Sequence, residues 1–174
     1  MQQSYAKPVL VFMAGASGSG KTTVLAKLLP KLKDYGLTPA IIKHACHLEL
    51  NQRKDSALYL EHGAPFVSVI SPKVVLQLTV PKQEMPLEQL LEQYDKNPNI
   101  DFILVEGYKN TKLPKIEVMR RGIQPQLYAN PQELLAVVTD MPEAVPSGIP
   151  VFDFQAESAL AEFIWQWYQE QVRK

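Results

Sequence analysis

The fold is decided by residues 9–22, which read VLVFMAGASGSGKT. Residues 9–14 form a continuous apolar run after Pro8, which is typical of a buried strand in a parallel sheet. Residues 15–22 match the pattern G-x-x-x-x-G-K-[S/T] at every fixed position. This pattern is typical of a loop that binds phosphate groups when it lies between a strand and a helix.

The helix expected after this loop extends from Thr22 to Tyr35, where apolar residues recur at helical spacing. Gly36 is expected to close it. Pro30 lies inside the pattern, so we expect it to kink the helix or to end its regular part. The required order of strand, loop and helix is therefore present, which argues against a glycine-rich turn that matches the pattern by chance.

The chemistry of such a loop follows from its backbone and its last residues. Glycines let the backbone curl so that its N–H groups form a nest for an anion, and the helix N-terminus adds partial positive charge. A lysine at the position of Lys21 reaches the β- and γ-phosphates of a nucleotide, and a hydroxyl at Thr22 ligates magnesium. The predicted nucleotide-binding residues of the loop are Gly15, Ser17, Gly18, Ser19, Gly20, Lys21, Thr22 and Thr23.

A second polar group is expected at Glu106, which ends the apolar strand 102–105 and precedes Gly107. Nucleoside triphosphatases hold magnesium with an acidic residue at this place. The alternative is an ordinary surface glutamate at a strand end. Asp55 is a candidate for a further magnesium ligand, since Thr22, Asp55 and Glu106 would supply the all-oxygen set that a hard cation prefers. Asp55 also fits the N-cap of the helix expected over 56–62.

The segment after the second strand (39–43) contains His44, Cys46 and His47. These residue types bind zinc, but the three lie one or two positions apart and a fourth ligand is missing. A polar loop in which a histidine donates a hydrogen bond is the favoured interpretation.

The remaining pattern predicts an α/β fold: a P-loop nucleoside triphosphatase with a mainly parallel, twisted sheet and flanking helices. We expect one domain over residues 1–174. Further helices are expected over 87–94 and 156–172, and further strands over 116–119 and 134–138. Two apolar strands, 66–70 and 74–80, predict an additional β-hairpin.

Composition excludes several classes of function. The chain carries 18 basic and 18 acidic residues, so its net charge is zero, which argues against a general nucleic-acid binder. Its single cysteine allows no internal disulfide and favours a reducing, cytoplasmic location. No apolar run approaches the roughly 18 residues needed to span a bilayer.

Together these motifs resemble the MobB family of molybdenum cofactor biosynthesis. The resemblance rests on residues 15–23, Ile-Lys-His at 42–44, Lys-Asp-Ser at 54–56 and Leu-Val-Glu-Gly-Tyr-Lys at 104–109. It implies a GTP-binding, weakly hydrolytic adapter that is often dimeric, while magnesium as a cofactor is expected from the predicted ligands. The implied partners are the nucleotidyltransferase MobA and the molybdenum insertion protein MoeA.

Two other functions are compatible with the same core. A small-molecule or nucleotide kinase would need lid arginines, and Arg120 and Arg121 follow a strand without a helical insertion. A metal-delivery GTPase would use the histidines and the cysteine of residues 44–47. Asp140 is a candidate for recognising the nucleotide base, since it could accept hydrogen bonds from N1 and N2 of guanine. The alternative is that Asp140 is a turn residue before Pro142. The preference for GTP over ATP rests on the resemblance.

The hairpin leads to an expectation about assembly. An isolated two-stranded hairpin is marginal in water, and an apolar one needs a cover. Residues Val74, Leu76, Leu78 and Val80 share one face of the second strand. We expect a second copy of the chain to cover the hairpin and form a two-fold homodimer. Charged substitutions at Leu76 and Leu78 would break this dimer. The alternative is that the chain's own sheet covers the hairpin.

Overall fold

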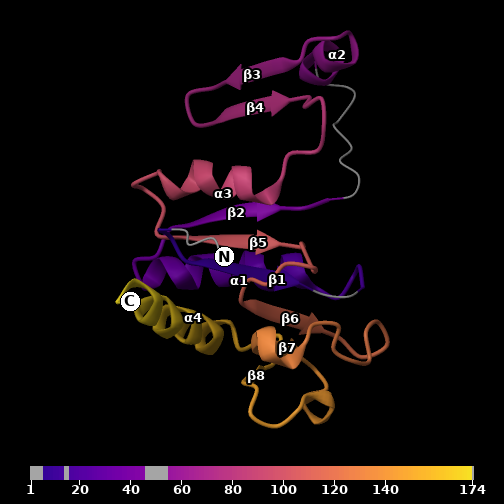
Figure 1. The fold of residues 1–174 in the computed structure, drawn as a ribbon, viewed down its shortest axis with the longest axis vertical. Helices are drawn as coiled ribbons and strands as arrows, with labels where there is room; N and C mark the ends of the chain where they lie inside the picture. Colours follow the sequence, from indigo (N-terminus) through magenta and orange to yellow (C-terminus); the bar gives the residue numbers. More distant parts are fainter. Residues whose placement is uncertain (1–5, 14–15, 46–54, 174) are drawn as a thin grey trace. The chain divides into compact units, whose positions relative to one another are not determined.

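The structure, a computed structural model, describes residues 6–13, 16–45 and 55–173. Figure 1 shows the order of its elements along the chain. The strands are β1 (Val9–Met13), β2 (Pro39–Lys43), β3 (Phe66–Ile70), β4 (Val75–Thr79), β5 (Phe102–Glu106), β6 (Lys115–Met119), β7 (Leu134–Thr139) and β8 (Val151–Phe152). The helices are α1 (Lys21–Asp34), α2 (Asp55–Glu61), α3 (Leu87–Asp95) and α4 (Glu157–Val172), with 3₁₀ turns at Pro131–Glu133 and Pro142–Ala144. None of the helices in these ranges is both long and apolar enough to cross a membrane.

The chain divides into two compact units, residues 1–44 with 90–174 and residues 45–89. The second unit contains the hairpin that the sequence pattern sets apart, together with α2. The boundary falls inside α3. A single domain over residues 1–174 stays a prediction.

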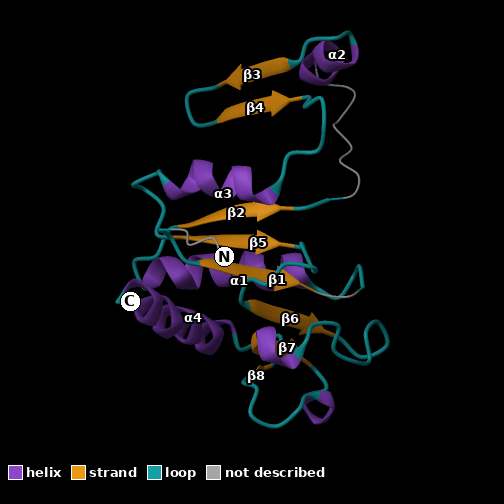
Figure 2. Cartoon of the chain, viewed as in Figure 1, coloured by secondary structure: helices purple, strands orange, loops and turns teal. Residues whose placement is uncertain are grey.

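The first unit contains a six-stranded sheet in the order β2-β5-β1-β6-β7-β8 (Figure 2). Every neighbouring pair in it is parallel, as the alternating pattern of strands and helices predicts. All six carboxyl ends therefore lie at one edge, and β1 lies between two strands that are distant from it in sequence. Open α/β sheets bind their ligands at this edge, where the strand order reverses.

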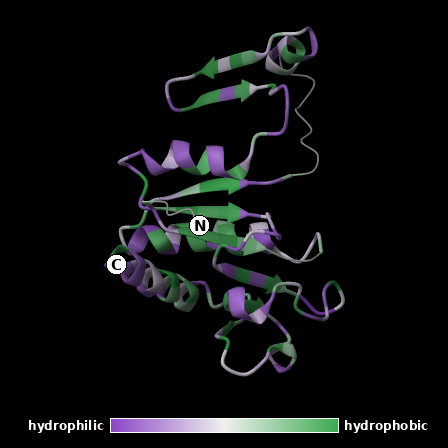
Figure 3. Ribbon diagram, in the orientation of Figure 1, coloured by the Kyte–Doolittle hydropathy of each residue, from purple (hydrophilic) through white to green (hydrophobic). Residues whose placement is uncertain are grey.

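The core explains why the central strands read as continuous apolar runs. All five residues of β1 and of β5 are buried, so both faces of these strands are covered. On one face, α1 and α4 pack against alternate residues of β1, β5, β6 and β7, and Figure 3 shows the central strands as hydrophobic along their length. Of the apolar positions predicted to form one face of α1, Tyr35 is 39% exposed and Leu29 is partly buried. The other four are buried, namely Val24, Leu25, Leu28 and Leu32. Burying each such side chain stabilises the fold by about 1.5–3 kcal/mol.

One expectation about α1 is partly wrong, because the helix continues past Pro30 to Asp34 and does not end there. Its end is at Tyr35, as the pattern predicts. The N–H of Gly36 donates to Lys33 O (2.9 Å) and that of Leu37 to Leu32 O (3.0 Å). These two bonds form a Schellman motif, which satisfies carbonyls that the helix leaves unpaired.

In the second unit, β3 and β4 pair antiparallel as predicted. Val67 lies opposite Leu78, and Val69 lies opposite Leu76, so these four residues share one face. Val67 is buried, and β3 contacts α2. On the other face, Phe66, Ile70 and Val75 are between 61% and 77% exposed. An apolar hairpin of this kind requires a cover.

Candidate functional site

The loop between β1 and α1 has the geometry of an anion site in the part that is described, residues 16–20; Gly15 lies outside the described residues. Gly20 is the N-cap of α1 and has φ +98°, a backbone conformation that residues with a side chain rarely adopt. It has no side chain to cap the helix, and the first turn contains no acidic residue. The first N–H groups of α1 therefore receive no side-chain cap, so they can donate to a phosphate.

The hydroxyl of Ser19, in the middle of this loop, is a further sign of a ligand site. Ser19 is fully buried, and its Oγ has no hydrogen-bond partner among the described residues. A buried polar group without a partner is costly and uncommon in folded proteins. Ser17, Gly18, Thr22 and Thr23 are exposed at the same loop and first helical turn.

The structure brings together two of the three predicted metal ligands. Thr22 Oγ1 donates to Glu106 Oε1 at 2.7 Å, and Glu106 is 7% exposed. The parallel pairing of β2 and β5 places Lys43 beside Glu106, with its ammonium 3.6 Å from the same oxygen. The hydroxyl and the carboxylate are hard oxygen donors of the kind that Mg²⁺ prefers, so the residues present fit that ion.

Asp55 is the first residue of α2, where its negative carboxylate interacts favourably with the positive end of the helix dipole. It belongs to the second unit, and its role as a magnesium ligand stays a prediction.

Lys21 is the centre of the site's electrostatics. Burial lowers the pKa of its ammonium below the ordinary value of 10.5, and the nearby charges of Lys109 and Lys43 lower it further, while Glu106 opposes the shift. The charges of two further lysines and one glutamate thus act on Lys21. An anion bound at this site would relieve the repulsion between the lysines.

The turn after Glu106 brings the ends of β5 and β2 into contact. His44 N donates to Glu106 O at 2.9 Å, and the rings of His44 and Tyr108 lie 4.5 Å apart. Gly107 has φ +102°, and a Cβ atom there would approach His44 Cβ to 3.2 Å. Tyr108 follows at φ +49°, also in the left-handed region. Residues held in such conformations cluster at binding sites.

Asp140, the candidate base-binding residue, lies at the carboxyl end of β7 and is exposed. Its Oδ1 accepts the backbone N–H of Arg121 at 2.8 Å, so it connects the loops that follow β6 and β7. The turn before Pro142 is held instead by Thr139, whose hydroxyl accepts Met141 N at 3.0 Å. The side chain of Asp140 therefore bonds to the loop after β6, and its role at the base stays a prediction.

The two arginines after β6 do not form a lid. Arg121 pairs with Glu143 at 2.7 Å on the surface, and Arg120 lies 4.3 Å above the ring of Phe154. Residues 120–130, all of them described, contain no helix. This arrangement lacks the helical insertion that a kinase lid requires.

The metal-delivery alternative rests on residues 44–47, of which the structure describes only His44 and Ala45. Among the described residues, no group of three His, Cys, Asp or Glu side chains is placed to hold a metal ion. Cys46 and His47 lie outside the described residues, and the ring of His44 lies against Tyr108.

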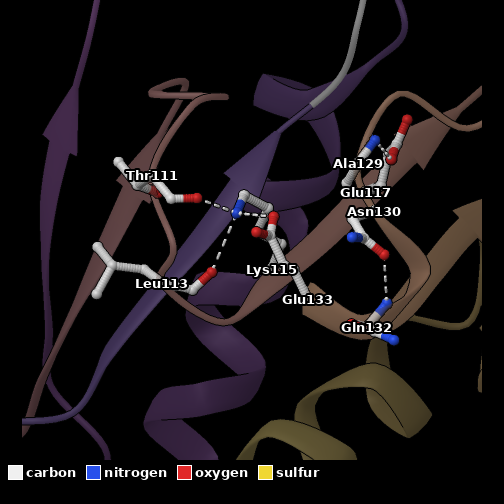
Figure 4. A network of polar contacts seen from close by, with 8 residues as sticks. All are labelled: Thr111, Leu113, Lys115, Glu117, Ala129, Asn130, Gln132 and Glu133. Carbon is white, nitrogen blue, oxygen red and sulfur yellow. Dashed lines mark hydrogen bonds and ion pairs between the residues drawn. The ribbon is translucent and has the colours of Figure 1, made fainter. Parts of the chain in front are cut away.

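Sequence reasoning missed a polar layer on β6. Lys115 and Glu117 are both fully buried on the face opposite Ile116 and Val118. Lys115 Nζ donates to the carbonyls of two residues in the preceding loop and to Glu133 Oε2 at 2.7 Å (Figure 4); the two carbonyls belong to Thr111 and Leu113. Glu117 accepts from the backbone of the following loop. The sequence pattern that could have revealed this layer is Lys-Ile-Glu-Val-Met at 115–119, in which charged residues alternate with apolar ones in a buried strand.

A parallel sheet whose central strand leads into a glycine loop and an uncapped helix, beside a strand that ends in a buried glutamate, defines a P-loop type of nucleoside triphosphatase fold. Residues 9–140 match the family model MobB, described as "Molybdopterin guanine dinucleotide synthesis protein B". The chain belongs to this family.

Relatives of known description cover nearly the whole chain. The "Molybdopterin-guanine dinucleotide biosynthesis adapter protein" of Escherichia coli (strain K12) is 33% identical, over 94% of this chain and 95% of that protein. The protein of the same description from Haemophilus influenzae is 31% identical, over 91% of this chain and 88% of its own. The crystal structure of Bacillus subtilis MobB has the same fold, with a TM-score of 0.68 at 23% identity, covering 90% of this chain and 96% of that one.

Proposed function

We propose that this protein is a GTP-binding adapter in the biosynthesis of molybdopterin guanine dinucleotide, with slow hydrolysis of its own. The names of the relatives supply the pathway. The observation that carries nucleotide binding is the contact between Thr22 and Glu106 at 2.7 Å, beside Lys21 and the uncapped start of α1.

In this proposal the loop residues hold the phosphates. Backbone N–H groups from Ser17 to Thr23 donate to phosphate oxygens, and Ser19 supplies a buried hydroxyl. The ammonium of Lys21 faces the β- and γ-phosphates. Gly15 is assigned to the loop by its place in the motif.

Magnesium would be held by the Thr22 hydroxyl and by Glu106, directly or through water, with Asp55 as a further candidate. When bound, the ion neutralises phosphate charge. Lys43 lies beside Glu106 and already balances the charge of that carboxylate.

The test is a binding titration of the wild-type protein and two lysine variants with GTP and GDP. We expect Lys21→Ala to weaken binding by at least tenfold, which is about 1.4 kcal/mol, because the charge that faces the phosphates is removed. Lys27→Ala is the matched control, since Lys27 is an exposed residue on the same helix. Unchanged affinity in Lys21→Ala would exclude this loop as the phosphate site.

Selectivity for the base is assigned to Asp140, whose carboxylate would accept from N1 and N2 of guanine. Competition between GTP and ATP measures this selectivity directly. We expect the wild-type protein to favour GTP, and we expect Asp140→Asn to lose most of that preference. An unaltered preference would show that another group reads the base.

We further propose that the protein is a homodimer joined through the β3–β4 hairpin. The predicted interface face supports this arrangement, because its residues Val74, Leu76 and Val80 are apolar and between 48% and 64% exposed, so they need a cover. A MobA-type nucleotidyltransferase and a MoeA-type molybdenum insertion protein are the proposed partners. The single cysteine fits a cytoplasmic location.

A further inference from the structure

We propose that Gln124 is a positioning residue for the phosphate loop, and that Glu117 holds Gln124 in the one orientation in which it can act. The inference rests on the proposed nucleotide binding and adds a residue that lies outside the phosphate-loop motif. It starts from one contact: Ala16 N, at the beginning of the loop, donates to Gln124 Oε1 at 3.1 Å.

The orientation of the Gln124 amide follows from its partners. Its Nε2 donates to Glu117 Oε1 and to Gln126 O, the latter at 3.1 Å. A flipped amide would place its NH₂ against the Ala16 N–H, which is also a donor. The flip would also place its oxygen against a carboxylate and a carbonyl, which are both acceptors. The hydrogen bonds therefore permit one orientation, and in it the oxygen faces the loop.

Glu117 is held in turn by the backbone. Besides Gln124, its carboxylate accepts Tyr128 N at 2.8 Å and Ala129 N at 2.9 Å. Glu117 is fully buried on β6, and Gln124 is 6% exposed. Buried groups with every partner in place form rigid networks. The chain from β6 through Glu117 and Gln124 thus fixes the start of the phosphate loop to the strand beside β1.

The same segment also lies against the end of the loop. A Cβ atom on Gly20 would be 3.8 Å from Arg120 Cζ, and Arg120 is stacked on Phe154. Residues 120–128 therefore bond to the phosphate loop at Ala16, and the Arg120 side chain lies close to Gly20. A loop restrained at its start loses less conformational freedom when phosphate binds, so its affinity is higher.

The experiment compares single and double variants by titration with GDP and by thermal unfolding without nucleotide. Gln124→Met keeps the shape of the side chain but removes its hydrogen bonds. We expect it to weaken GDP binding about tenfold, since about 1.4 kcal/mol is one decade in affinity. Gln126→Met is the matched control, because Gln126 is exposed and bonds to Gln124 through its backbone carbonyl. We expect its affinity to stay within about twofold of wild type.

A double-mutant cycle with Glu117→Gln separates positioning from stability. If Glu117 acts through Gln124, the substitution Glu117→Gln weakens GDP binding in the wild-type background. In the Gln124→Met background the same substitution changes the affinity for GDP by less than about twofold. Independent, additive losses would overturn the chain of contacts. A folded Gln124→Met protein with wild-type affinity and only a lower midpoint of unfolding would overturn the positioning role.

Hydrogen exchange in the unmodified protein gives a second test that requires no variant to fold. The Ala16 amide should exchange slowly in the absence of nucleotide, because it is bonded to a buried side chain. Exchange at the rate of an unstructured amide would overturn the proposal. If the wild-type protein binds no nucleotide, the proposed function fails and this inference fails with it; if wild type binds and Gln124→Met binds equally, only this inference fails.

Discussion

Gly107→Ala is the substitution whose effect the structure specifies most closely. Gly107 follows Glu106 directly, and its N–H donates to Phe12 O at 2.9 Å, so the turn is fixed to β1. Two separate costs arise there. The backbone conformation at φ +102° costs a residue with a side chain about 1–2 kcal/mol. The new Cβ would also lie 3.2 Å from His44 Cβ and 3.4 Å from His44 O.

The second cost is one of overpacking, because neither neighbour is the flexible end of a side chain. Extra atoms in well-packed sites cost about 1–3 kcal/mol. The sum predicts a loss of about 2–5 kcal/mol in the free energy of unfolding. Gly122→Ala isolates the first cost, since Gly122 has φ +75° and a methyl group added there would meet no other atom within 4 Å.

Urea unfolding of the three proteins, followed by tryptophan fluorescence, measures both losses. We expect Gly107→Ala to lose about 1–3 kcal/mol more than Gly122→Ala, which is the packing cost alone. The altered turn should also weaken magnesium-dependent nucleotide binding through Glu106. Equal losses in the two variants would refute the argument that the close approach to His44 requires glycine.

Three further predictions concern the whole protein. Nucleotide affinity should be full below the pKa of Lys21 and should fall as pH rises through it, because phosphate binds the charged ammonium. Burial lowers that pKa in the free protein, so the fall should begin below pH 10.5. A Lys21→Arg variant should give a flatter profile in the same titration. Purified protein should hydrolyse GTP at roughly 10⁻² per second or less, since the sequence contains no recognisable water-positioning glutamine or arginine finger, and a phosphate-release assay giving tens per second would contradict the adapter role. Light scattering should give a mass near twice 19.6 kDa, and Leu76→Asp, at an exposed residue of the predicted interface face, should give the monomer; a monomeric wild type would exclude the dimer.

The elements with strong local patterns could be predicted from the sequence. The hydrophobic run of β1, the spacing in α1 and the hairpin strands all appear within one or two residues of their expected bounds. β8 was missed because two residues carry no measurable periodicity. The helix does not end at Pro30, because tertiary packing of α1 on the sheet outweighs the loss of one helical hydrogen bond.

The site was predictable only where a motif fixes the chemistry. The pairing of Thr22 with Glu106 follows from two local patterns and the rule that parallel strands end at one edge. Gln124 has no such pattern, because its role depends on a loop conformation 108 residues away from Ala16 in the chain. Charged residues inside a buried strand, as at Glu117, are the part of that network that a sequence can reveal.

The two sides of the phosphate loop differ in a way that suits an anion. On the β5 side, the carboxylate of Glu106 lies beside Thr22 and Lys43, where a cation can share it. On the β6 side, the N–H of Ala16 also needs an acceptor, but a carboxylate there would repel an incoming phosphate. Gln124 supplies a neutral oxygen at that place and keeps the charge of Glu117 one side chain further from the loop. A neutral acceptor supported by a buried carboxylate thus restrains the loop without adding negative charge beside its ligand.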